Sequence, residues 1–184
     1  HKKNAMLRRV NQELEAANER ILELTRIDPL TQVANRRYFD ERITEMLSLS
    51  KRRSQPLSII MTDLDKFKHV NDAFGHDAGD RVLVGYAALM KRTVRTEDLV
   101  ARLGGEEFII LLPHTESGQA FALAERIRER LPQEDFIGNN QRVTASFGIS
   151  QLRQIETVSE FMKRADMALY RAKESGRNRT VLDA

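Results

Sequence analysis

The segment Leu99–Leu112, LVARLGGEEFIILL, decides the fold because it predicts a β-hairpin with an acidic tip. Two apolar runs, Leu99–Leu103 and Phe108–Leu112, have the length of strands and flank the pair Gly104-Gly105. Glycine permits a positive φ and lets a ligand approach the backbone closely. The carboxylates of Glu106-Glu107 therefore lie at this tip, either as ligands or as ordinary polar turn residues.

The rest of the chain alternates strand and helix patterns around this hairpin. Leu57–Asp63 predicts a buried strand that ends on a carboxylate, and Asp28-Pro29 is a helix-start signal. The other expected elements are helices over 35–53, 80–94, 117–131 and 159–175, a strand over 143–150 and an edge strand over 180–182. This order predicts an α+β fold, ferredoxin-like, with a central mainly antiparallel sheet and helices on one face.

Two pairs of carboxylates are expected to converge in that fold. The first strand ends at Asp63 and Asp65, and the hairpin tip carries Glu106 and Glu107. Adjacent carboxylates repel each other, so a hard cation is a physical reason for them to meet. The chain has no cysteine and its four histidines are scattered, so oxygen ligation of Mg²⁺ or Mn²⁺ is the expected metal chemistry.

Composition excludes several classes of protein. The 184 residues are 41% hydrophobic and 31% charged, as in a folded globular protein. The absence of cysteine excludes a disulfide scaffold and a thiol nucleophile. Apolar stretches are too short to cross a bilayer and no signal peptide opens the chain, so we expect a cytoplasmic location and no membrane contact by this segment.

Residues 1–26 differ from the rest of the chain and predict a helical stem. Apolar residues recur there at alternating spacings of three and four, the pattern of a coiled-coil seam: Leu7, Val10, Leu14, Ala17, Ile21 and Leu24. We favour a parallel homodimeric coiled coil; the alternative is an amphipathic helix packed on its own domain. The expected division is a stem over 1–26 and a folded domain over 27–184, and because the seam begins with the first residues we expect that an upstream part is missing from this segment.

The net charge of +3 invites a comparison with nucleic-acid-binding proteins. Six basic and four acidic residues lie in 1–26, which leaves a net charge of +1 for the remaining residues. The basic excess therefore belongs largely to the stem and forms no contiguous basic stripe elsewhere. We expect no nucleic-acid partner.

The hairpin tip, Gly104-Gly105-Glu106-Glu107-Phe108, resembles the signature turn of the GGDEF family, the diguanylate cyclases, in its GGEEF form. Other blocks resemble the family in order and spacing: Asp28-Pro29-Leu30-Thr31, Asn35-Arg36-Arg37, Asp63–Lys68, Asn71-Asp72, Phe74-Gly75-His76, Gly79-Asp80, Ala165-Asp166, Ala168-Leu169-Tyr170, Ala172-Lys173 and Gly176-Arg177-Asn178. Gln32 departs from the glycine that the family usually has. The resemblance covers about residues 26–182 and implies the palm-type sheet of nucleotidyl cyclases.

The resemblance implies that two GTP molecules are condensed into cyclic di-GMP with release of two pyrophosphates. Asp63, the backbone carbonyl of Leu64, and Glu106 resemble the metal ligands. Glu107 resembles either a further metal ligand or the base for the attacking 3′-hydroxyl. Because the product is a two-fold dinucleotide, two domains would meet antiparallel, and a dimeric stem would raise their effective concentration.

The remaining substrate contacts are also implied by the resemblance. Asn71 and Asp80 resemble guanine-binding residues; the alternatives are a turn cap for Asn71 and a helix N-cap for Asp80. The residues that resemble phosphate-binding groups are Phe67, Lys68, Lys173 and Arg177. For the last two, the alternative is favourable charge at a helix C-terminus.

Arg95-Thr96-Glu97-Asp98 matches the family's RxxD inhibitory motif, five residues before Gly104. Arg126 resembles the arginine that a neighbouring subunit contributes to the same product site. The alternative is an ordinary Arg–Asp surface pair of little energetic value. The leading function is an active, product-inhibited diguanylate cyclase, and the competing one is a catalytically weak receptor or scaffold that binds GTP or cyclic di-GMP.

Overall fold

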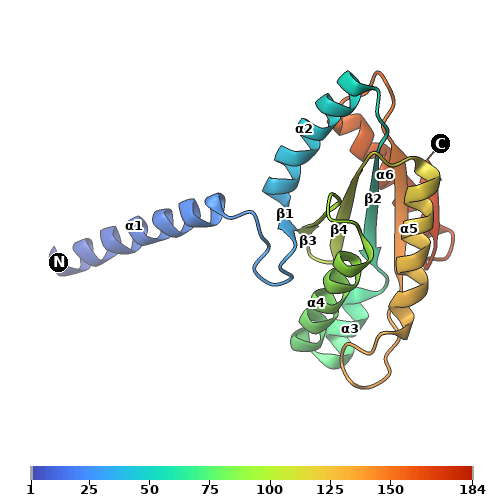
Figure 1. Cartoon of the computed structure of the whole chain (residues 1–184). Helices are drawn as coiled ribbons and strands as arrows, with labels where there is room; N and C mark the ends of the chain where they lie inside the picture. Colours follow the sequence, from blue (N-terminus) through green and yellow to red (C-terminus); the bar gives the residue numbers. More distant parts are fainter. Residues whose placement is uncertain (1, 184) are drawn as a thin grey trace.

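The computed structural model describes residues 2–183, with the side chains of all of these except residues 2 and 22–24. Across that range six strands form one sheet (Figure 1). The strands are β1 (Ala34–Asn35), β2 (Leu57–Leu64), β3 (Leu99–Gly104), β4 (Glu107–Pro113), β5 (Ala145–Gln151) and β6 (Thr180–Asp183). The helices are α1 (Lys2–Leu24), α2 (Arg36–Arg53), α3 (Phe67–Phe74), α4 (His76–Thr93), α5 (Ser117–Arg130) and α6 (Val158–Glu174).

The sheet order is β1-β3-β4-β2-β5-β6, with β2 at the centre. β2 pairs antiparallel with both β4 and β5, and β3 with β4 forms the predicted hairpin. The two edge strands, β1 and β6, pair parallel with their neighbours. The expectation of a mainly antiparallel α+β sheet is confirmed, and the short strand β1 is an addition to it.

Helices cover both faces of the sheet, so the expectation of helices on one face is wrong (Figure 1). One apolar core holds Ile60 and Phe108 together with residues of α3, α4 and α5. The other holds Ile59 and Ile109 together with residues of α2 and α6. Because strand side chains alternate between faces, a strand buried on both sides reads as a continuous apolar run, as β2 does.

Two predicted helix starts are also wrong. The helix expected from Asp80 begins at His76, and the separate helix α3 precedes it, with Gly75 at φ 89° between the two. Asp28-Pro29 opens a turn, in which the Asp28 carboxylate accepts a hydrogen bond from the Thr31 amide at 2.9 Å. Helix α2 begins only at Arg36, after Asn35 caps it by accepting from the Tyr38 amide.

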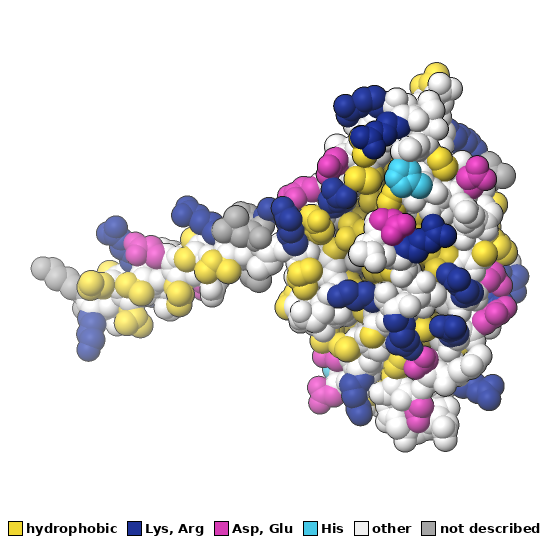
Figure 2. Space-filling model, in the orientation of Figure 1, with side chains coloured by type: hydrophobic (Ala, Val, Ile, Leu, Met, Phe, Trp, Pro, Cys, Tyr) yellow, Lys and Arg dark blue, Asp and Glu magenta, His cyan; other side chains and the backbone are white. Residues whose placement is uncertain are grey.

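Helix α1 extends away from the sheet domain and exposes its apolar residues (Figure 1). Leu7, Leu14 and Ile21 are 62%, 60% and 58% exposed, and Figure 2 shows hydrophobic side chains along the helix. The described part of the stem therefore does not pack on its own domain. Leu24, the last residue of the proposed seam, has its side chain outside the described residues. None of the helices within residues 2–183 is long and apolar enough to span a bilayer.

Candidate active site at the C-terminal end of β2

The structure brings the two carboxylate clusters together at one end of the sheet. Asp63 in β2 lies directly opposite Glu107 in β4. The tip between β3 and β4 has positive φ at both Gly104 (148°) and Gly105 (50°). A register shift in β3 accompanies this turn, and the Leu64 amide donates to the carbonyl of Glu106 at 3.4 Å. The glycines thus let the chain turn tightly enough to set Glu106 and Glu107 beside the end of β2.

Burial and mutual repulsion shape the electrostatics of this cluster. Burial raises the pKa of Asp63, an effect that the Lys173 ammonium opposes and the charges of Glu106 and Asp65 reinforce. Burial, with the charges of Asp63 and Asp166, also raises the pKa of Glu107. Lys173, from the last turn of α6, forms an ion pair with Asp63. The cluster therefore carries more negative charge than its own cations neutralise.

One further cation near the cluster is Arg36, whose charge opposes the rise in the pKa of Glu107. Arg36 is the first residue of α2, and β1 places it beside the hairpin by pairing with β3. The sequence motif Asn35-Arg36-Arg37 was noted, but nothing in its spacing indicated a position near the carboxylates. Arg36 and Asp166 are additions to the predicted site.

The donor set at this end of the sheet fits a hard divalent cation. Asp63, Glu106 and Glu107 supply the carboxylate oxygens that Mg²⁺ and Mn²⁺ prefer. Within residues 2–183 no three His, Asp or Glu side chains form a ready-made metal cluster. Mg²⁺ is commonly held by one or two carboxylates together with substrate phosphates, so these three carboxylates fit a magnesium site that is completed by the substrate.

Asp65, expected to belong to the acidic cluster, has a different environment. It is 9% exposed and accepts hydrogen bonds from the hydroxyls of Thr144 and Ser146 and from the amide of Asn178. These bonds fasten the end of β2 to the approach to β5 and to the turn after α6. Asp65 is a structural residue that holds the active-site segments in place.

Asn71 and Asp80 lie close together where α3 meets α4. A methyl group added at Gly79 would lie 1.9 Å from the Asn71 Oδ1 atom, so the carboxamide rests directly on the glycine. Asp80 follows Gly79 and is exposed, with its side chain unpaired among the described residues. Both capping alternatives are wrong, since Gly75 is the N-cap of α4 and Asn71 lies inside α3.

The four predicted phosphate-binding residues come from two elements. Phe67 is the first residue of α3 and is buried, so only its backbone amide faces outward from the helix start; Lys68 follows it and is exposed. Lys173 and Arg177 come from the end of α6 and the turn that follows. Arg177 has φ 60°, and the turn is held by the Arg177 amide donating to the Ala172 carbonyl at 3.0 Å.

The family model described as diguanylate cyclase, GGDEF domain, matches residues 25–179. The chain belongs to the GGDEF family. It is 41% identical over 165 residues to a diguanylate cyclase of Vibrio cholerae, and 40% identical over 171 residues to diguanylate cyclase A of Treponema denticola. These matches cover 89% and 90% of this chain but 51% and 46% of the relatives, so the chain spans about half their length.

Solved GGDEF structures have the same fold. The active GGEEF domain of a Vibrio cholerae diguanylate cyclase is 40% identical, with a TM-score of 0.80 over 82% of this chain and 97% of that one. The coiled coil and GGDEF domain of DgcB from Caulobacter crescentus, solved with c-di-GMP, is 28% identical, with a TM-score of 0.83. That match covers 100% of both chains.

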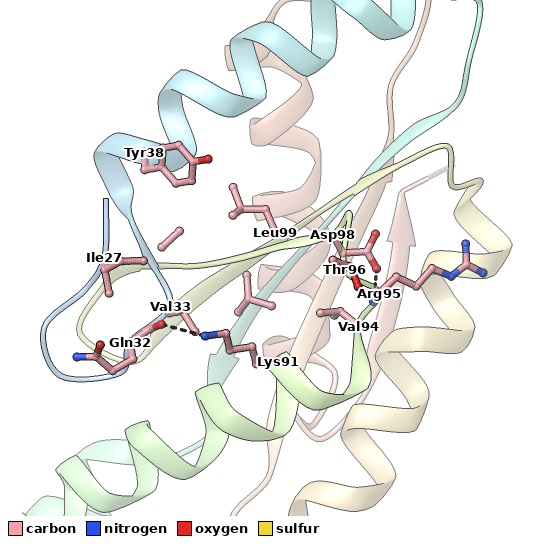
Figure 3. Close-up of a pocket in the computed structure, with 12 residues that line it drawn as sticks. Ile27, Gln32, Val33, Tyr38, Lys91, Val94, Arg95, Thr96, Asp98 and Leu99 are labelled. Carbon is pink, nitrogen blue, oxygen red and sulfur yellow. Dashed lines mark hydrogen bonds between the residues drawn. The ribbon is translucent and has the colours of Figure 1, made fainter. Parts of the chain in front are cut away.

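The RxxD segment of this GGDEF domain borders a cavity of about 370 Å³ between the turn at 27–34 and the end of α4 (Figure 3). The Arg95 amide donates to Asp98 Oδ2 at 2.8 Å, whereas the Arg95 guanidinium points away from the cavity (Figure 3). Among the described residues, Asp98 Oδ1 is buried without a hydrogen-bond partner, and burial raises the pKa of this carboxyl. Arg95 contacts Asp98 through its backbone amide and not through its guanidinium, so the alternative of a simple Arg–Asp surface pair does not describe this contact.

Arg126 is not one of the residues that line this cavity. It is exposed on α5, and nothing in the single chain brings it to Arg95 and Asp98. The action of Arg126 from a neighbouring subunit stays a prediction.

Proposed function

We propose that this chain is a diguanylate cyclase that condenses two GTP molecules into cyclic di-GMP and releases two pyrophosphates. The observation that carries the proposal is the register pair of Asp63 with Glu107, beside Glu106 and Lys173, at the glycine turn. In each half-reaction a 3′-hydroxyl oxygen bonds to the α-phosphorus of the other GTP. The bond to the pyrophosphate leaving group breaks, and the hydroxyl proton passes to a base. Two such steps close the ring.

Asp63, the Leu64 carbonyl and Glu106 would hold a divalent cation, which supplies charge stabilisation at the phosphates when bound. Glu107 is suited to accept the 3′-hydroxyl proton because its pKa is raised by burial and by Asp63. Lys173 and Arg177 would neutralise the triphosphate, together with Lys68 and the amide of Phe67. Asn71 and Asp80 would bind guanine, since a carboxylate accepts from its N1–H and N2–H₂ groups.

The reaction requires two domains, because each GTP supplies the hydroxyl that attacks the other. The proposed assembly is therefore an antiparallel pair of GGDEF domains, held at high local concentration by a stem dimer over residues 1–26. A full-length protein with an upstream sensor or receiver domain fits this arrangement, and its catalytic segment would work in the cytoplasm, where GTP is available.

Chromatography of the products after incubation with GTP and Mg²⁺ tests the proposed activity. We expect cyclic di-GMP from the parent and at least a hundredfold less from Glu106→Gln, because that change removes a negative ligand. Glu41→Gln is the matched control, since its pair with Arg37 is half exposed and of little energetic value. A folded dimer that binds GTP and makes no cyclic dinucleotide would favour the receptor or scaffold function instead.

Product inhibition through the RxxD segment is a separate part of the proposal. The unpartnered Asp98 Oδ1 beside a cavity supports it, because a guanine N–H group would satisfy that oxygen. Arg95 and the Arg126 of a second domain would bind guanine O6 and N7 or a phosphate. We expect Arg95→Ala to relieve inhibition by added cyclic di-GMP without changing the initial rate at low product. An Arg95→Ala enzyme as sensitive as its parent would contradict this site.

A further inference from the structure

A second cavity, of about 270 Å³, lies beyond the end of β2. Its walls come from the turn between β2 and α3, the segment 141–144 before β5, and the turn after α6. Four residues with basic side chains line it: Lys66, His69, Arg142 and Arg177. Only Arg177 belongs to the substrate contacts described above.

The basic side chains around this cavity have no protein partner. Within residues 2–183 none of the four side chains takes part in a hydrogen bond or ion pair. The acidic residue in the wall, Asp65, directs its carboxylate to Thr144, Ser146 and the Asn178 amide. A concave surface with several unpaired cations is suited to a multiply charged anion.

The cavity adjoins the proposed triphosphate contacts through α6. Lys173 pairs with Asp63 at the carboxylate cluster, and Arg177, four residues further along in the turn after α6, lines the cavity. The wall that carries Arg142 is fixed to the same place, because the Asp65 amide donates to the Thr144 carbonyl at 2.8 Å. The basic residues Lys173, Arg177 and Arg142 therefore connect the carboxylate cluster with this cavity.

We propose that Arg142 and His69, with Lys66, complete a polyphosphate subsite next to Arg177. The subsite takes the terminal phosphates of the nucleotide, and then the pyrophosphate once its bond to the α-phosphorus has broken. This assignment rests on the proposed function for its place in the reaction, and it adds no covalent step. The ligand class is a linear diphosphate or triphosphate, recognised by charge and by the planar guanidinium of Arg142.

Calorimetric titration with inorganic pyrophosphate, without added metal, tests the subsite. We expect Arg142→Gln to raise the pyrophosphate Kd about five- to tenfold, and His69→Gln to weaken pyrophosphate binding as well. The matched control is Arg52→Gln on α2, an exposed arginine at the opposite end of the sheet. GMP lacks the terminal phosphates, so its Kd should be the same in Arg142→Gln and in the parent.

The Arg142 side chain has no partner among the described residues, so its replacement should leave Tm unchanged; circular dichroism checks this. Equal pyrophosphate affinity in Arg142→Gln and parent would overturn the subsite, as would an equal loss in Arg52→Gln. If Arg142→Gln loses pyrophosphate affinity while the parent makes no cyclic dinucleotide, the subsite stands and the cyclase proposal fails. If the parent makes the product and Arg142→Gln binds pyrophosphate normally, the subsite alone is wrong.

Discussion

Glu107 lies where negative charge accumulates, half-buried beside Asp63 and near Asp166. Its raised pKa means that the folded state holds this proton more tightly than the unfolded state does. The ionised carboxylate therefore destabilises the fold at pH values above that pKa; the effect declines as the pH falls through it and disappears below the ordinary Glu pKa of the unfolded state. Such a cost is common at active sites, where chemistry requires charges that folding does not favour.

We therefore predict that Glu107→Gln stabilises the protein while reducing its activity. At neutral pH the Tm should rise by about 1–3 °C, because the repulsion with Asp63 is removed. The difference should shrink toward about pH 4, where the parent carboxyl is protonated as well. Thermal melts across this pH range measure both effects, with Glu41→Gln as the exposed control. A Tm that falls at neutral pH would show that Glu107 stabilises the fold.

Asp63 and Asp65 are separated by one residue and yet differ completely in their surroundings. Asp63 faces a lysine and two glutamates, whereas Asp65 accepts hydrogen bonds only from neutral groups. Sequence reasoning placed both in one acidic cluster, because spacing alone does not reveal that the chain turns at Lys66, with φ 52°. The residue types alone predicted the carboxylate chemistry of this segment. The environment of Asp65 was not predicted, because its hydrogen-bond partners lie about 80 and 113 positions further along the chain.

At the scale of elements, Arg102 joins the hairpin to the turn that follows the stem. Its Nε donates to the Gly105 carbonyl at 2.9 Å, and its Nη1 lies 3.3 Å from Asp28 Oδ2. Both side chains are 17% exposed, so this pair is more shielded from water than the ion pair of Arg37 with Glu41 on α2. Arg102 thus fixes the glycine turn and the 28–31 turn relative to each other.

We predict that Arg102→Gln lowers the free energy of unfolding by about 1–3 kcal/mol, because it removes the cation beside the half-buried Asp28 carboxylate and the donor to the Gly105 carbonyl. Urea denaturation measures this loss. Arg37→Gln, which breaks a half-exposed pair, should cost less than about 0.5 kcal/mol. Adding Asp28→Asn to Arg102→Gln should cost less than the two single changes together, since they share one interaction. Strict additivity would contradict the link.

The elements differ in how well the sequence predicted them, for identifiable reasons. The hairpin and β2 were predicted because short, mainly apolar runs and a glycine pair mark them clearly. Helix α3 was not predicted, and α4 was expected to begin only at Asp80, because the boundary between the two helices depends on one glycine with φ 89°. The packing of helices on both faces of the sheet was not predicted, because the order of the strands does not show which face of the sheet each connecting helix covers.

At the scale of the whole molecule, the exposed apolar stripe of α1 remains the unpartnered surface that the proposed dimer would cover. We predict that Leu7→Glu, Leu14→Glu and Ile21→Glu together give a monomer in sedimentation experiments. Specific activity at low protein concentration should then fall at least about tenfold, while the Kd for a GTP analogue stays the same. The matched control places three glutamates on the side of the helix away from the seam, at Ala5, Gln12 and Ala16. Unchanged turnover by a monomeric triple variant would contradict the role of the stem.

The short edges of the sheet have a consequence for how such domains are brought together. β1 has two residues and β6 has four, so neither offers a long open row of backbone groups to another chain. Short edge strands hinder the joining of sheets between molecules, a common route to fibrils and irreversible aggregates. Copies of the domain held together by the proposed stem dimer would therefore be able to separate again, which would suit the proposed encounter of two domains in each catalytic cycle.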